Sequence, residues 1–166
     1  MLSSKQKRTF KIFLDSNNTE SYDGSLFNAT YYVDLTHIIF QDEDFDKQYK
    51  MSFNFQSIFN TTAISGFDPK PIYSLHIDMG KGLNIFQYRQ VKNPSGLLQI
   101  SNYVDGANNY YGFNTKETDN LPVLVQNIRN MNMITLNVIN TTTNSTLSGI
   151  NAGTMNYICV LTFEEI

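Results

Sequence analysis

The sequence has no tryptophan, only one cysteine, little charge and no long apolar run. Its 166 residues carry a net charge of −3, so no overall electrostatic attraction to nucleic acid or acidic lipid is expected. The single cysteine, Cys159, cannot form an intramolecular disulfide, and its apolar surroundings in the sequence predict a buried thiol in a reducing compartment. No segment approaches the roughly 18 apolar residues of a membrane-spanning helix. We expect no secretion signal, because Met1 to Arg8 is polar and basic.

Aromatic and uncharged polar residues fill the chain instead. Hydrophobic residues make up 41% and aromatic residues 13%, with 12 Phe and 10 Tyr, a usage that favours strands over helices. Charged residues are only 16%, below the usual quarter, so the surface can be buried against neighbouring molecules at low cost. The length suits one domain with a substantial core. We expect a flexible basic tail over residues 1–8 and a single domain over residues 9–166.

Alternation of apolar and polar residues predicts strands in four places. Each segment has apolar side chains at every second position, which is the period of a strand with one buried face. The segments are Phe27–Leu35, Tyr49–Phe55, Met133–Val138 and Tyr157–Phe163. The last segment is apolar on both sides, so we expect a central strand with both faces at least partly covered.

Turn signals separate these segments from shorter ones. Phe10 to Leu14 is the expected first strand, and Leu98 with Ile100 forms a short one. Asp105-Gly106 is the strongest hairpin signal, with Tyr110 to Phe113 as its return strand. The chain holds about ten strand candidates, with turns at the spacing typical of an all-β sandwich or barrel. No helix is predicted, although Val125 to Asn130 could hold one turn.

An acidic segment is the nearest approach to a metal-binding motif. Asp42, Asp44 and Asp46 have the spacing that opens a calcium loop. Lys47 stands where that loop needs glycine, and Phe53 stands where it needs a bidentate glutamate. We therefore favour a solvated acidic loop over a cation site.

The other residues that could carry chemistry are isolated. His37 and His76 are the only histidines, and no spacing places either one beside the other or beside Cys159. Gly80-Lys81-Gly82 is predicted to be a turn into a strand over Leu83 to Tyr88, because no helix follows it to bind a phosphate. We predict no catalytic residue, no metal site and no cofactor.

Two pairs of segments resemble a family of viral proteins. Phe10–Asn18 (FKIFLDSNN) and Phe27–Leu35 (FNATYYVDL) resemble the start of small single jelly-roll capsid proteins. These proteins belong to double-stranded DNA viruses of the virophage, polinton-like and giant-virus group. Met133–Asn140 and Tyr157–Glu165 are similar to the way such proteins end. The resemblance implies an all-β fold, a single jelly-roll β-sandwich of two antiparallel sheets with about four strands each.

The function that this resemblance implies is that of a structural virion protein, either a penton protein at the vertices or a minor capsid protein. Such a protein is made in the host cytoplasm, is not secreted and works in the capsid without a small-molecule substrate. It is expected to form a homo-oligomer, a pentamer by preference or a trimer, beside the major capsid protein. The candidate contacts are the aromatic anchors Tyr32, Tyr110 and Tyr111 and, toward membrane or genome, the basic residues Lys5, Lys7 and Arg8.

Two other classes of protein stay open. A carbohydrate- or receptor-binding β-sandwich, such as a fibre tip or a lectin-like module, would use Tyr110 and Tyr111, whose Asn and Gly neighbours suit an adaptable contact loop. The same tyrosines could equally be core residues. A cupin-like metalloenzyme would need a cluster of histidines, which two isolated histidines do not supply.

Overall fold

The chain folds into β-structure with short 3-10 turns and no α-helix in the residues that the structure describes. The computed structural model describes residues 7–22, 25–38, 42–60, 67–79, 95–106, 108–115, 123–147 and 155–166. The strands are β1 (Thr9–Asp15), β2 (Ser21–Tyr22), β3 (Asn28–Tyr32), β4 (Tyr49–Asn60), β5 (Tyr73–Asp78), β6 (Gly96–Asp105), β7 (Asn108–Asn114), β8 (Val123–Val125), β9 (Met133–Asn140), β10 (Ser145–Thr146) and β11 (Met155–Glu165). The 3-10 helices are η1 (Ser16–Asn18), η2 (Asp42–Asp46) and η5 (Ile128–Asn130). None of the helices in these ranges has the length and apolar character that crossing a membrane requires.

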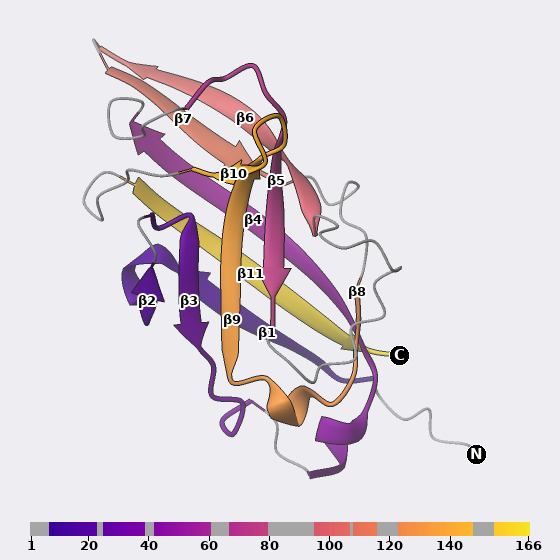
Figure 1. The fold of residues 1–166 in the computed structure, drawn as a ribbon. Helices are drawn as coiled ribbons and strands as arrows, with labels where there is room; N and C mark the ends of the chain where they lie inside the picture. The colour runs from indigo at the N-terminus through magenta and orange to yellow at the C-terminus, as the bar shows by residue number, and fades with distance from the viewer. Residues whose placement is uncertain are drawn as a thin grey trace.

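The strands follow one continuous antiparallel path that wraps around the core. Their order is β1-β11-β4-β7-β6-β5-β9-β3-β2, with β8 paired to β4 and β10 paired to β9. Figure 1 shows β3, β9 and β5 in front of β1, β11 and β4. The prediction of an all-β fold is therefore confirmed.

We predicted two separate sheets of about four strands each, and this prediction is wrong. The strand β6 pairs with strands of both layers and so joins them into one sheet. Its first residues pair with β5, so that Leu98 lies opposite Tyr73. From Gln99 onward the same strand pairs with β7, where Gln99 lies opposite Asn114. One long strand thus continues the hydrogen bonding from one layer to the other, which leaves the sheet nearly closed.

The last strand is central, as its apolar character predicted. β11 lies between β1 and β4, and Cys159 stands opposite both Leu14 and Phe55. Every second side chain from Tyr157 to Phe163 is buried, which confirms the predicted alternation. Burial raises the pKa of the Cys159 thiol far above its usual value, so this sulfur stays protonated and unreactive.

Aromatic rings join the two layers across the core. Phe27 is fully buried and packs against Phe59, Phe113 and Tyr157, with ring centroids 5.5 to 6.2 Å apart. The Tyr31 hydroxyl donates a hydrogen bond to the Tyr157 hydroxyl. Desolvation raises the pKa of both phenols, which therefore stay neutral and can donate. The layers are held together by packing and by this buried pair of hydroxyls.

The hairpin signal at Asp105-Gly106 is confirmed. Gly106 has a φ of +59°, a left-handed conformation that glycine adopts without strain, and Asp105 pairs with Asn108 across the turn. The strand before it runs from Gly96 to Asp105 and is longer than the short segment predicted around Leu98 and Ile100. The predicted turn and strand over residues 80–88 lie outside the described residues.

Candidate interaction surfaces

The nearly closed sheet has an open seam beside β1. This strand pairs with β11 on one side only, and no described strand pairs with its other edge. Backbone N–H and C=O groups on such an edge can pair with another chain. A groove of about 320 Å³ lies here, lined by β1 residues 11–14 and by residues 31–34, which end β3 and follow it. The seam is defined by these two segments.

Two exposed aromatic rings border the seam. Tyr32 is 69% exposed and Phe13 is 68% exposed. Tyr32 also lies opposite Met133 of β9, whose side chain is about half exposed. The position of Tyr32 suits the contact role predicted for it. Phe13 was not among the predicted contacts, although the sequence held the signal: it is an apolar residue at an outward position between Lys11 and Asp15.

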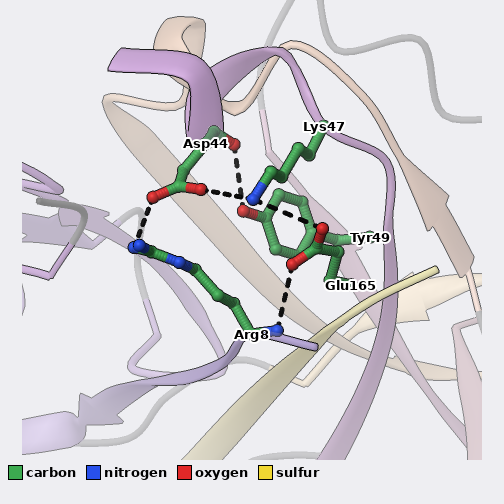
Figure 2. A network of polar contacts seen from close by, with 5 residues as sticks. All are labelled: Arg8, Asp44, Lys47, Tyr49 and Glu165. Atoms are coloured by element: carbon green, nitrogen blue, oxygen red, sulfur yellow. Dashed lines mark hydrogen bonds and ion pairs between the residues drawn. The ribbon is translucent and has the colours of Figure 1, made fainter. Parts of the chain in front are cut away.

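The start of β1 is held to the end of β11 by a network of charged groups, shown in Figure 2. The Asp44 carboxylate is the centre of the network, with Oδ1 accepting a hydrogen bond of 2.6 Å from Lys47 Nζ and Oδ2 forming an ion pair with the Arg8 guanidinium. The Tyr49 hydroxyl donates to the Asp44 backbone oxygen at 2.9 Å. Glu165 Oε2 accepts the Arg8 backbone N–H at 3.0 Å, and Lys47 Nζ lies 3.3 Å from Glu165 Oε1. The network ties η2 to both ends of the domain.

The predicted solvated acidic loop is wrong for Asp44. Its side chain is 1% exposed, whereas Asp46 in the same 3-10 helix is exposed. A buried carboxylate is tolerated only with charged partners and hydrogen bonds. Arg8 and Lys47 supply these, so Asp44 works as a structural anchor.

The network also explains two shifted pKa values. The hydrogen bond from the Arg8 backbone N–H, followed by the one from Lys47, holds the pKa of Glu165 below its usual value. The hydrogen bond to Asp44 raises the pKa of Lys47. Both groups are therefore charged at neutral pH, and the network loses the charge of Glu165 in acid.

Glu165→Gln should make the protein's stability less dependent on pH in the acid range. A carboxyl whose pKa is lower in the folded state stabilises the fold above its unfolded pKa, and this contribution is lost as the pH falls through the folded pKa. The stability difference between parent and variant should therefore be largest at neutral pH and shrink below about pH 4. Urea denaturation at a series of pH values measures it, with Glu164→Gln, an exposed neighbour, as the control. A difference that stays constant with pH would contradict this role of Glu165.

The basic residues that were predicted to form a contact tail differ in their surroundings. Arg8 is bound to Asp44 and Glu165, so it is a residue of the domain and not of the predicted tail. Lys7 is exposed at the edge of the described part. Lys5 lies outside the described residues. The structure therefore leaves Lys7 as the one described residue of the three that stays available to an anionic surface.

The tyrosines of β7 differ in their surroundings. The Tyr111 ring packs against the core, with its centroid 5.0 Å from that of Phe67 and 6.5 Å from that of Phe59. Tyr110 is half-buried and lies opposite Tyr103 of β6. The Tyr111 ring therefore packs mainly against the core, and only part of the ring is accessible to a partner.

The histidines lie apart. His37 is exposed and 3.7 Å from the Asp34 carboxylate, whereas His76 is half-buried in β5 with its Nε2 3.0 Å from Ser74 Oγ. Within the described ranges, no three side chains of His, Cys, Asp or Glu are grouped so that they could hold a metal ion. These contacts of the two histidines are thus with neighbouring residues of their own segments.

Comparison with known proteins adds no relative to this picture. No protein family, curated protein or solved structure matches the chain. A function must therefore be inferred from the strand order, the seam and the other surfaces of the described residues.

Proposed function

We propose that the chain is a structural virion protein, a penton or minor capsid protein of an icosahedral double-stranded DNA virus. It acts by packing against copies of itself, in a pentameric ring by preference, and against a neighbouring major capsid protein. The ring contact is heterologous, because the seam of one subunit meets a different surface of the next. No chemical reaction is part of this function.

The strand order supports a single jelly roll as the underlying fold. Eight strands fall into the orders β1-β11-β4-β7 and β6-β5-β9-β3. When these eight strands are numbered by their place in the chain, the two orders match those of two interleaved Greek keys. That is the arrangement of strands in a jelly roll. The strands β2, β8 and β10 are short additions of two or three residues. Capsid proteins, lectins and cupins share this arrangement, so the fold supports a capsid role by analogy only.

The observation that carries the proposal is the open seam. An unpaired strand edge with two large exposed aromatic rings is a surface that a free monomer normally protects. Lys11 is the only lysine of β1, and this strand holds no proline. Covering the seam with a neighbouring subunit would pair the edge and bury Phe13 and Tyr32, as aromatic anchors do in stable interfaces.

The mass of the purified protein in solution tests the proposal. Light scattering should give a closed oligomer, with a mass five times that of the chain for the favoured ring. Phe13→Glu and Tyr32→Glu should each shift the mass toward the monomer, because a charge would be buried in the contact. Both side chains are about two-thirds exposed, so the monomer should still fold.

Val104→Glu is the matched control, because Val104 is an apolar strand residue of similar exposure (70%) on β6. It should leave the mass unchanged. A parent protein that is strictly monomeric at high concentration would refute the proposal. Equal effects of all three variants on the mass would show that the seam is not the contact between subunits.

A further inference from the structure

A second groove crosses the outer face of β1, β11, β4, β7 and β6. It has a volume of about 340 Å³, and the described residues that line it differ from those of the seam. The strand register places Asp15, Ile158, Gln56 and Asn114 next to one another on four neighbouring strands. With β6 as the fifth strand, the face spans four inter-strand spacings, or roughly 19 Å. The groove is therefore long enough for a short chain-like ligand.

A glycine makes room for an aromatic wall at one end of the groove. Gly112 of β7 lies opposite Ser101 of β6, two residues before Tyr103. A Cβ on Gly112 would stand only 3.4 Å from Cε2 of Tyr103, so the tyrosine ring lies over the glycine backbone. Half of the Tyr103 side chain stays exposed. An open tyrosine ring next to a bare stretch of backbone is suited to packing against the flat face of a ligand.

Polar side chains along the groove are partly fixed and partly free. The Asp15 carboxylate accepts hydrogen bonds of 2.9 Å from the Asn17 backbone and side chain, and the Asn114 amide donates to Ser101 Oγ at 2.8 Å. These contacts hold two polar groups in place. The amides of Gln56 and Asn156 are exposed and have no hydrogen-bond partner among the described residues. The groove thus offers free donors and acceptors beside a rigid frame.

The chemistry of the lining favours a neutral carbohydrate. A sugar hydroxyl is both donor and acceptor, as is a side-chain amide, while the C–H face of a pyranose ring is apolar and suits Tyr103, Ile58 and Ile158. The two isoleucines are about half exposed on the floor of the groove. Aromatic and aliphatic surface with a few placed polar groups is the usual make-up of a small-ligand site.

The same lining speaks against other ligands. The described residues of the groove include one carboxylate, Asp15, and no lysine, arginine or histidine. Nucleic acids and sulfated or sialylated glycans need cations to offset their charge. A second protein subunit would need a flat surface of roughly 800 Å² with an apolar centre, whereas this face is hollowed and rich in amides.

We infer that the outer-face groove binds a neutral oligosaccharide, with Tyr103 packing against one sugar ring and the Gln56 and Asn156 amides bonding its hydroxyl groups. This activity is separate from the self-association proposed above, because it uses a different face. It would give an assembled particle or a free subunit a means of attaching to uncharged surface glycans.

The test uses the full chain on an array of neutral, sialylated and sulfated oligosaccharides, followed by titration with the best neutral binder. We expect neutral glycans to bind, and we expect both Tyr103→Ala and Gln56→Ala to weaken binding about tenfold or more. Tyr103→Phe should retain most of the affinity, because the ring remains. Val104→Ala, the exposed neighbour on the same strand, should bind as the parent does.

Three binding results would overturn the inference: no binding to any neutral glycan, binding confined to anionic glycans, or neutral binding that Tyr103→Ala and Gln56→Ala leave unchanged. Thermal melting of each variant checks that the loss of binding is not a loss of folding. The solution mass of Tyr103→Ala should equal that of the parent. A fall to monomer would identify this face as a subunit contact and would also overturn the inference, while leaving the proposed self-association standing.

Discussion

Asp44→Asn is expected to lower the free energy of unfolding by about 2–3 kcal/mol at neutral pH. The carboxylate is 1% exposed and faces two cations, Arg8 and Lys47, which are 37% and 22% exposed. An amide keeps the shape but removes the negative charge, and its N–H groups would point at a cation. The loss should stay below the 3–5 kcal/mol of a fully buried pair, because both cations still reach water. For a domain of this length, it corresponds to a fall in melting temperature of roughly 5–10 °C.

Asp46→Asn is the matched control, because Asp46 is an exposed carboxylate in the same 3-10 helix. We expect its effect to stay within about 0.5 kcal/mol, the usual range for surface substitutions. Chemical denaturation of the two variants compares them directly. If both lose the same small amount, the network in Figure 2 contributes no more than an ordinary surface ion pair.

The contrast between these two aspartates shows what the sequence could reveal and what it could not. Alternation at every second residue depends on neighbours in the chain, so it correctly marked the buried side of β4 and β11. Asp44 pairs with Arg8, which lies near the start of the sequence, and Lys47 in turn pairs with Glu165 near its end, so these groups meet only after folding. No local pattern carries that information. The prediction of a solvated acidic loop was therefore right about the exposure of Asp46 and wrong about Asp44, and the segment forms a 3-10 helix.

The sheet path shows the same limit. The Asp105-Gly106 turn was predictable because a hairpin is a local event with a fixed residue preference. The role of β6 in both layers could not be predicted, since the second half of this strand is exposed without alternation and its pairing with β7 depends on the whole sheet. The amides of the outer-face groove come from β4, β7 and β11 and from η1, which only the folded sheet brings together. Each of them looks like an ordinary surface residue in the sequence.

Gly112→Ala is the other substitution with a large expected effect, about 2–4 kcal/mol of lost stability. A Cβ at this position would overlap the backbone carbonyl oxygen of Ser57 on β4. Backbone in a central strand cannot move aside as a flexible side chain can. The Phe113 N–H donates to Ser57 Oγ at 3.0 Å, so the residue next to Gly112 is also held against Ser57. An added methyl group should therefore push β7 away from β4.

Gly106→Ala separates this steric effect from the general cost of replacing a glycine. Gly106 has a φ of +59° and open space where a Cβ would stand, so its replacement costs only the left-handed backbone conformation, about 1–2 kcal/mol. Gly112 has no positive φ, and its cost is entirely one of space. Urea denaturation should rank Gly112→Ala as the more damaging of the two. The opposite ranking would mean that β4 and β7 can separate without loss, and that the close approach of Ser57 to Gly112 does not hold this part of the sheet together.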